Sequence, residues 1–600
     1  MICGCFSPNQ EFRKAQSLEL AKRIEQPGRE NHSIEFHHLT VHLIGETNLQ
    51  QHFFIDEERN CLLVYSGHIY GEEFVDSEKT VARQLYERYL QKGNLFCTDL
   101  NGDFSLLIYA PKSGKLLLAR DHLGIVPLSY AKQENTLLFS SDHFHLCALL
   151  HQDSKDFNPM ALMGGITSIP YPLSIHHGVH KLLPGHFLNY DDHTYGQERY
   201  WFPESIRSDH RIQRTQALEE LKQLLNDAIR IRIPKSGKCT AHVSGGLDSS
   251  YLAAHLSKFQ PQIDRQFYSW SPDYSIIPKQ EHDERELIEA FETHTEQKVT
   301  LLDSDPQDSS LLESAYFPGL SSFEEERTLA AAKEAGYQIL FSGWGGDEFL
   351  GMTDPPIIQD VFRSFRWLRA WKGIKKEGIR RKVGYFWYQL LLPSLGFIHP
   401  SIKETLRKEV YYLKKGEDMI DWEQQKKIYC YRSRRHRMIQ QLSAYRIAER
   451  TDISYALSYL YNIEYKYPLL DKRIIEYLFQ IPSNLVFSER ENRSLMRQLS
   501  RELLPPKISE NQRKRDPALD QLSEIFYSEC TWRFSKRIPE IQNESILSIF
   551  KLPSIQEDLS KFGKEEIGEE EKEILMSFVY NLEMFVQFCE KYDHEKICSK

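Results

Sequence analysis

The stretch Val243-Ser-Gly-Gly-Leu-Asp-Ser-Ser250 decides the fold of the second part of this 600-residue chain. It lies between an apolar run that predicts a strand, 239–243, and a run that predicts a helix, 249–256. Gly245 and Gly246 allow the backbone to turn sharply and to approach a ligand closely. The free N–H groups and the positive dipole end of the helix face the turn. The stretch therefore predicts a phosphate-binding loop that opens an α/β nucleotide-binding domain.

The acidic residue of this loop, Asp248, indicates a divalent cation. A carboxylate repels phosphate unless a metal ion lies between them, and Mg²⁺ prefers oxygen ligands. A second glycine loop, Ser342-Gly-Trp-Gly-Gly-Asp-Glu348, also follows a predicted strand and supplies Asp347. We expect Asp248 and Asp347 to share Mg²⁺ at the phosphates. The first loop lacks the lysine of the G-x-x-x-x-G-K-[ST] pattern, so γ-phosphoryl transfer is not expected.

The chain before residue 206 has a different pattern. Short apolar runs separated by turns predict strands, Val81–Leu90 predicts a helix, and the turn at 112–115 predicts a hairpin. We expect an α+β layered domain over 1–205. The second domain is expected over 206–600, with a helical insertion around 355–445.

Composition excludes several classes of protein. Hydrophobic residues make up 41% and charged residues 27%, which is ordinary for a folded protein and excludes overall disorder. The net charge of -10 gives no support to nucleic-acid binding. The ten cysteines are scattered without a C-x-x-C pair, so we expect a reducing, cytoplasmic location. The most apolar run, 385–398, is too short to span a membrane and contains Pro393.

With these motifs in place, the sequence resembles the asparagine synthetase family over nearly its whole length. Glu464-Tyr-Lys-Tyr-Pro-Leu-Leu-Asp471 is similar to the family's E-x-R-x-P-F-L-D segment. Segments of the first part that are similar to its glutaminase-type domain are 66–70, 100–104 and 119–128. The resemblance implies an α+β then α/β architecture. An N-terminal Ntn-hydrolase-like αββα sandwich would precede a PP-loop (adenine nucleotide α-hydrolase-like) parallel-sheet domain with helical additions.

The resemblance also implies a reaction and a set of site residues. Enzymes with this loop use ATP to adenylate a carboxylate and release pyrophosphate. Leu504-Pro505 with Arg513 and Lys514 resembles the late L-P…R-x-K stretch, whose lysine stabilises negative charge at the acyl carbon. Arg513, one residue away, remains a candidate for the same role. The residues implied to bind the nucleotide are Val243, Ser244, Gly245, Gly246, Asp248, Ser249, Ser269, Ser342 and Gly343.

Several positions depart from the family pattern. Glutamine-using members carry a nucleophilic cysteine directly after the initiator methionine, whereas here Ile2 precedes Cys3. Ser66 stands at the position of the oxyanion-hole asparagine. We therefore expect the first domain not to hydrolyse glutamine. Trp344 replaces the glutamate of asparagine-forming members. Glu449 aligns near a downstream glutamate that acts as a base, although it could equally be a surface carboxylate paired with Arg446 or Arg450.

Three features favour the branch that closes lasso peptides. Tyr268-Ser-Trp-Ser-Pro272 resembles a segment of that branch, Trp344 fits it, and the helical stretch between 348 and 449 offers walls for a large substrate. The expected partner is a precursor peptide, together with a leader-peptide protease or a leader-binding protein. Alternatives are an asparagine synthetase-like amidotransferase or a β-lactam synthetase-like ligase on a small acid, and a non-catalytic nucleotide-binding scaffold.

One further stretch is strongly basic. Arg363, Arg366, Arg369, Lys372 and Lys375 recur every three residues between aromatic and leucine side chains, which predicts an amphipathic basic helix over 361–382. The simplest interpretation is a solvated helix packed on the domain. A dock for a leader peptide or a partner protease remains open, and contact with an anionic membrane is possible but not expected.

Overall fold

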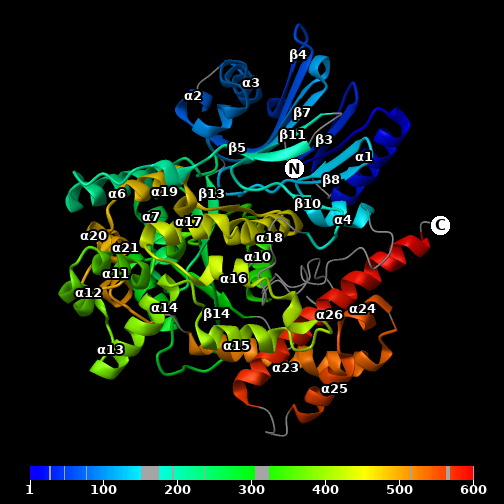
Figure 1. Cartoon of the computed structure of the whole chain (residues 1–600). Coiled ribbons are helices and arrows are strands. Elements are labelled where there is room, and N and C mark those ends of the chain that lie inside the picture. The colour runs from blue at the N-terminus through cyan, green and yellow to red at the C-terminus, as the bar shows by residue number, and fades with distance from the viewer. Residues whose placement is uncertain are drawn as a thin grey trace.

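The computed structural model describes residues 1–25, 29–45, 48–75, 78–150, 174–191, 195–235, 237–303, 323–513, 516–542, 544–562 and 568–598. The first part of the chain, up to residue 205, lies at the top of Figure 1 and rests on the larger second part, residues 206–600. No helix among the described residues is long and apolar enough to cross a membrane.

Two stacked antiparallel sheets form the first part. The strand order of the first sheet is β10-β8-β9-β1-β3-β2, and the strand order of the second is β12-β11-β7-β6-β5-β4. The strands of the first sheet are β1 (Ile2–Phe6), β2 (Glu30–Phe36), β3 (Leu39–Gly45), β8 (Ser129–Gln133), β9 (Thr136–Ser140) and β10 (His180–Lys181). Those of the second are β4 (Phe53–Asp56), β5 (Cys61–Tyr70), β6 (Asn101–Ala110), β7 (Lys115–Arg120), β11 (His186–Tyr190) and β12 (Tyr195–Arg199). The hairpin predicted at 112–115 joins β6 to β7 and is confirmed.

Alternation of side chains along the strands creates the layers. Val41 and Leu43 from the first sheet and Leu62 and Val64 from the second belong to one buried cluster between the sheets. The outer face of the first sheet packs against α1 (Gln10–Ile24) and α4 (His143–Leu150). The outer face of the second packs against α3 (Val81–Lys92). The αββα sandwich that the resemblance implied is thus confirmed.

A five-stranded parallel sheet organises the second part. Its order is β15-β14-β13-β16-β17, and every neighbouring pair is parallel. The strands are β13 (Lys238–His242), β14 (Asp264–Pro272), β15 (Val299–Leu302), β16 (Ile339–Phe341) and β17 (Glu464–Lys466). The helices of its α/β units are α6 (Arg214–Arg230), α7 (Leu247–Phe259), α8 (Arg285–Thr295) and α10 (Phe323–Glu334). The predicted order of strand, glycine loop and helix at 239–256 is confirmed as β13 and α7.

Most of the remaining chain is helical and surrounds the lower part of the sheet (Figure 1). The helices up to β17 are α11 (Asp354–Arg363), α12 (Trp367–Gly373), α13 (Ile379–Tyr385), α14 (Leu392–Ser394), α15 (Pro400–Glu409), α16 (Trp422–Tyr429), α17 (Arg434–Ser443) and α18 (Arg446–Tyr461). Those after it are α19 (Lys472–Gln480), α20 (Ser483–Val486), α21 (Ser494–Ser500), α22 (Pro506–Ser509), α23 (Pro517–Arg537), α24 (Glu544–Ile549), α25 (Leu552–Lys561) and α26 (Glu569–Cys598).

The prediction of one amphipathic helix over 361–382 is wrong. The stretch contains the end of α11, all of α12 and the start of α13. Phe365 has φ +59° and Gly378 has φ +78°, and both left-handed residues lie at breaks between helices. The repeat of basic residues every three positions could not predict these breaks. Such a pattern shows which side chains would share one face of a helix, but not whether the helix is continuous.

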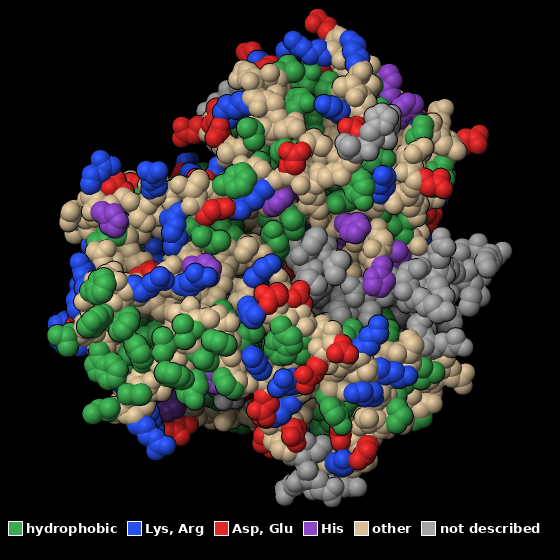
Figure 2. Space-filling model, in the orientation of Figure 1, with side chains coloured by type: hydrophobic (Ala, Val, Ile, Leu, Met, Phe, Trp, Pro, Cys, Tyr) green, Lys and Arg blue, Asp and Glu red, His purple; other side chains and the backbone are tan. Residues whose placement is uncertain are grey.

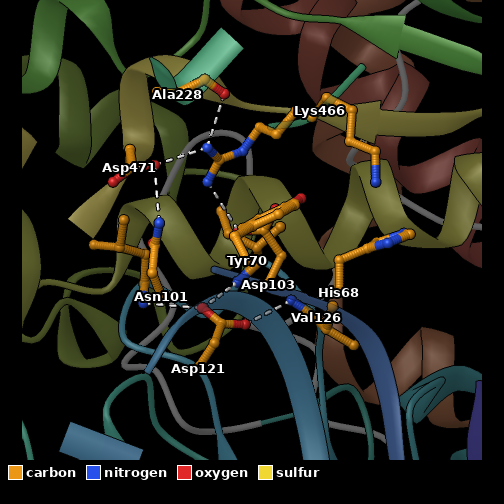
Figure 3. A network of polar contacts seen from close by, with 12 residues as sticks. His68, Tyr70, Asn101, Asp103, Asp121, Val126, Ala228, Lys466 and Asp471 are labelled. Carbon is orange, nitrogen blue, oxygen red and sulfur yellow. Dashed lines mark hydrogen bonds and ion pairs between the residues drawn. The ribbon is translucent and has the colours of Figure 1, made fainter. Parts of the chain in front are cut away.

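Buried ion pairs join the two parts of the chain. Arg232 from the second part stacks on Tyr70 at 4.4 Å from the ring centroid and pairs with Asp471 at 2.8 Å. Its other partner is Asp103 at 3.5 Å, which also accepts a hydrogen bond from the Tyr70 hydroxyl at 2.8 Å. Figure 3 shows Tyr70, Asp103 and Asp471 in this network. Since a buried charge is costly without a partner, each part of the chain supplies counter-charges that the other part needs.

A second buried cluster lies farther along the same interface. Asp452 on α18 pairs with Arg120 of the first part at 2.5 Å and with Lys181 at 3.0 Å. All three side chains are almost fully buried. These ion pairs hold α18 of the second part against the sandwich.

Candidate active site

The two glycine loops meet at one edge of the parallel sheet. Strands β13 and β16 are neighbours, and the loops that follow them leave the same carboxyl edge. That edge is where α/β sheets bind ligands. A cavity of about 340 Å³ opens there. Its walls come from the first loop (243–249), the second loop (342–344 and 347), Trp270, Glu284, Arg450 and residues between 492 and 513.

Glycines allow the two loops to interlock. A Cβ atom on Gly343 would lie 2.5 Å from the backbone nitrogen of Ser249. A Cβ atom on Gly346 would lie 2.3 Å from the carboxyl carbon of Asp248. Gly245 and Gly345 have φ of +72° and +99°, where residues with a side chain are strained. The loops therefore contact each other at distances that only glycine permits.

The two predicted acidic residues lie together, and one arginine connects them. The Nη2 atom of Arg493 is 2.5 Å from Asp248 Oδ2 and 2.9 Å from Asp347 Oδ1. Asp248 lies in the first turn of α7, and Asp347 lies in the π-helical turn Gly346–Leu350. Arg493 is itself in the left-handed region, with φ +53°, and its Nε donates to the carbonyl of Gly351. No sequence motif marks Arg493, which lies far from both loops in the chain.

This donor set fits a magnesium ion that also binds phosphate oxygens. Mg²⁺ in nucleotide sites takes one or two carboxylates and completes its shell with water and phosphate. Asp248 and Asp347 supply two carboxylates at the cavity, and Arg493 shows that the position between them favours positive charge. No cluster of three or more metal-ligating side chains occurs in the described ranges, so the fit depends on ligands from a bound nucleotide.

Most of the residues predicted to bind the nucleotide line this cavity. Ser244 and Ser249 share a hydrogen bond of 2.8 Å between their hydroxyl groups, and the Ser249 hydroxyl accepts the backbone N–H of Ser244. The Ser342 hydroxyl accepts the N–H of Trp344. The predicted residues that line the cavity are Val243, Ser244, Gly245, Gly246, Asp248, Ser249, Ser342 and Gly343.

Ser269 is placed differently from the prediction. It is buried, does not line the cavity, and accepts the backbone N–H of Ser271. Its neighbour Trp270 lines the cavity instead. Successive residues of a strand point to opposite faces, so a shift of one position separates a ligand contact from a core residue.

The carboxylate predicted as a base also lies outside the cavity wall. Glu449 on α18 does not line the cavity, and its charged neighbours are Lys181, Arg446 and Asp452. Burial raises the pKa of Glu449. The next residue, Arg450, lines the cavity and pairs with buried Glu325 at 2.5 Å. Glu449 is therefore neither a surface carboxylate paired with Arg450 nor a residue of the cavity wall.

A different carboxylate does reach the cavity. Glu284, at the start of α8, lines it. Burial raises the pKa of Glu284 to about 7, and the nearby carboxylates of Asp516 and Asp520 contribute to the rise. A group with a pKa near neutrality suits proton transfer at neutral pH. No motif marks Glu284, because its pKa depends on neighbours that are distant in sequence.

Of the two late basic residues, Arg513 lines the cavity and its Nη1 lies 2.6 Å from Nδ1 of His282. Lys514 lies outside the described residues.

The cysteine of the first part lies in the core. Cys3 is the second residue of β1 and is fully buried. Burial raises the pKa of its thiol to about 12. Since the thiolate is the nucleophilic form, this burial disfavours Cys3 as a nucleophile at neutral pH. All eight cysteines of the described side chains are free.

Comparison with known proteins agrees with this geometry. The family described as asparagine synthase matches residues 220–529, and the glutamine amidotransferase domain matches residues 28–201. The glutamine-hydrolyzing asparagine synthetase 3 of Bacillus subtilis is 24% identical over 486 residues, which cover 76% of this chain and 75% of that protein. Amidase chry2 of Gibberella zeae is 25% identical over 247 residues, 38% of this chain and 35% of that protein. Because the synthase match covers more than half of the residues, the chain belongs to the asparagine synthase family.

Proposed function

We propose that this protein is an ATP-dependent macrolactam synthetase that closes a lasso peptide. A side-chain carboxylate of an Asp or Glu in a precursor peptide attacks the α-phosphorus of ATP. The bond to the β-phosphate oxygen breaks, giving an acyl-adenylate and pyrophosphate. The N-terminal amine of the same peptide then attacks the acyl carbon. An isopeptide bond forms, and AMP and one proton leave.

The residues of the two loops would hold the triphosphate. The N–H groups at the start of α7 and the hydroxyl groups of Ser244 and Ser249 are the donors for phosphate. Asp248 and Asp347 would hold Mg²⁺, which supplies positive charge against the leaving pyrophosphate. Arg493, which pairs with both carboxylates and lines the cavity, would supply a further positive charge for phosphate oxygens.

The observation that carries the proposal is the pairing of an adenylation-type cavity with a buried Cys3. A family member that hydrolyses glutamine needs a thiolate, and the Cys3 thiol has a pKa of about 12. The amine must then come from another source. A peptide that carries both the acid and the amine meets this need and brings the two groups together at high effective concentration.

Aromatic walls support a peptide over a small acid. Trp270 and Trp344 both line the cavity. Trp344 packs edge-on against Tyr467 with ring centroids 6.3 Å apart, and Trp270 packs against His242 at 5.2 Å. Large apolar side chains bury peptide surface well, whereas the hydrophilic side chain of aspartate gains little from them.

A base must remove a proton from the attacking amine. We assign this role to Glu284 in place of Glu449, because Glu284 lines the cavity and its pKa is about 7. Glu449 lies outside the wall and serves as the comparison in the test below.

The second candidate is an asparagine synthetase-like ligase, or a β-lactam synthetase-like one, acting on a small acid. The similarity to the glutamine-hydrolyzing asparagine synthetase 3 of Bacillus subtilis favours it. Two features of this chain argue against it: Trp344 occupies the second loop, and Cys3 is buried.

The test uses the purified full chain with Mg²⁺-ATP and a synthetic precursor core peptide. We expect AMP, pyrophosphate and a peptide product lighter by one water. Pyrophosphate release that depends on free aspartate instead would favour the small-acid ligase, and its absence with every acid would favour a non-catalytic scaffold. Asp248→Ala and Asp347→Ala should each abolish release, while Asp418→Ala, at an exposed turn, should retain it.

A further inference from the structure

The chain exposes an unusual concentration of apolar side chains over α11 to α14. Half of the 22 large hydrophobic side chains that are exposed in the described part lie between 362 and 397. The members of this aromatic–basic face are Phe362, Phe365, Trp367, Leu368, Trp371, Ile379, Val383, Trp387, Tyr388, Leu395 and Phe397. Figure 2 shows them as a broad green area at the lower left, over the position of α12 to α14 in Figure 1.

These side chains are not marginally exposed. Phe365 is 84% exposed, Leu368 82% and Ile379 78%. Phe365 lies at the turn between α11 and α12 and has φ +59°, which is a strained conformation for a bulky residue. Patches of this kind are rare on monomeric proteins unless they bind something. A strained, projecting aromatic residue points to the same conclusion.

The same segment is strongly cationic. Residues 361–382 contain nine Lys or Arg and one acidic residue, Glu377. Arg369 pairs with Glu489 at 3.1 Å, and Lys375 pairs with Asp354 at 2.6 Å. Arg363 donates to a backbone carbonyl. The other six basic residues of this segment have no ion pair with a carboxylate within the described ranges; they are Arg366, Lys372, Lys376, Arg380, Arg381 and Lys382, of which Lys382 lies over the ring of Trp371.

Charge and apolar groups alternate along the same short helices. In α12, Trp367, Leu368 and Trp371 are exposed together with Arg369 and Lys372. In α13, Ile379 and Val383 are exposed beside Arg380 and Arg381. Trp and Tyr prefer the boundary between water and hydrocarbon, and Lys and Arg pair with lipid phosphates there.

We propose that the aromatic–basic face docks this protein on an anionic phospholipid membrane. Its α-helices have at most ten residues and no helix of the described chain can span a bilayer, so the contact is with the lipid headgroup layer. Six cations without carboxylate partners match a negatively charged surface. A fluid interface accepts separate projecting side chains, whereas a folded protein partner would need a matching rigid surface.

The location of the face relates it to the cavity. Helix α11 begins three residues after Gly351, whose carbonyl accepts a hydrogen bond from Arg493. The face and the cavity are thus linked through α11, which leads from the second glycine loop to the first exposed aromatic residues of the face. The docking itself does not depend on the proposed reaction.

The experiment is co-sedimentation of the full-length protein with vesicles. We expect binding to phosphatidylcholine vesicles that contain phosphatidylserine, weak binding to phosphatidylcholine alone, and loss of binding at about 1 M salt, where charges are screened beyond roughly 3 Å. Arg380→Glu with Arg381→Glu should weaken binding by more than about 25-fold, since each basic residue near the surface contributes about fivefold. Phe365→Ser with Leu368→Ser should weaken binding as well.

Leu95→Ser is the matched control, because Leu95 is 58% exposed on the first part of the chain, away from this face. It should bind vesicles as the unchanged protein does. Thermal unfolding and pyrophosphate release of all variants should be unchanged, which separates lost docking from lost folding or lost catalysis. The proposal is overturned if the unchanged protein does not bind anionic vesicles. It is equally overturned if it binds neutral ones as well, or if the face variants bind as the Leu95 control does.

Discussion

Replacing Gly346 with alanine tests the interlocked loops most directly. The added Cβ would lie 2.3 Å from Asp248 Cγ and 2.4 Å from its Oδ1, far inside the ordinary contact distance. Gly346 does not have a positive φ, so the backbone itself tolerates alanine. The clash therefore acts on Asp248, whose carboxylate must move away from Arg493 and from its place beside Asp347.

Two effects of this change have different sizes. Overpacking of this kind costs about 1–3 kcal/mol of folding stability. Loss of one preorganised charge at a reacting phosphate lowers kcat by about 10²–10³-fold, equivalent to about 3–4 kcal/mol. We therefore expect Gly346→Ala to fold with a modestly lower Tm and to lose nearly all acid-dependent pyrophosphate release.

The assay measures pyrophosphate release, Mg²⁺-ATP affinity by calorimetry and thermal unfolding on the same protein samples. Gly384→Ala is the matched control, because a Cβ there meets no atom within 4 Å. Alanine in place of this helical glycine should raise stability by up to about 1 kcal/mol. If Gly346→Ala released pyrophosphate and bound nucleotide as the unchanged protein does, the assignment of Asp248 to the phosphate site would be refuted.

Three more outcomes are expected. Cys3→Ala should leave pyrophosphate release unchanged, because the thiol is buried and protonated; a large loss, measured with glutamine as the only amine donor, would show a working glutaminase. With Glu284→Gln, ring closure should lose its pH dependence; in the unchanged protein the rate should fall about tenfold per pH unit below the pKa of about 7, because a protonated carboxyl cannot accept a proton. If Glu449→Gln removed that dependence instead, Glu449 would be the base. Asp452→Asn should lower unfolding stability in urea by about 3–5 kcal/mol, because Arg120 and Lys181 would stay buried without their partner; an effect no larger than that of exposed Asp418→Asn would contradict this.

Local sequence patterns predicted much of the fold. Strand β13, the glycine loop and α7 lie within three residues of their predicted bounds, because turn glycines and apolar periodicity are local signals. The convergence of Asp248 and Asp347 followed from two loops at one sheet edge. The layers of the first part required the family resemblance in addition, since alternating strands alone do not specify which sheets stack.

Two things limited the prediction of the site: one-residue errors in aligning a motif, and contacts between residues that are distant in the sequence. Ser269 and Trp270 differ by one position on a strand, and Glu449 and Arg450 by one on a helix, yet in each pair the second residue lines the cavity. A motif alignment that is uncertain by one residue cannot separate such neighbours. Arg493 and Glu284 belong to no motif, because their roles depend on contacts that only the folded chain creates.

The buried ion pairs between the sandwich and the second part have a consequence for evolution: the sandwich is needed for stability whether or not it hydrolyses glutamine. If the sandwich were deleted, Asp452 would lose both Arg120 and Lys181, and Arg232 would lose Asp103. We therefore expect the second part to need the sandwich for stability even though the thiol of Cys3 is buried. Substitutions can remove catalytic residues of the sandwich one at a time without removing these ion pairs. A shortened gene that encodes residues 206–600 alone should instead yield insoluble or unstable protein.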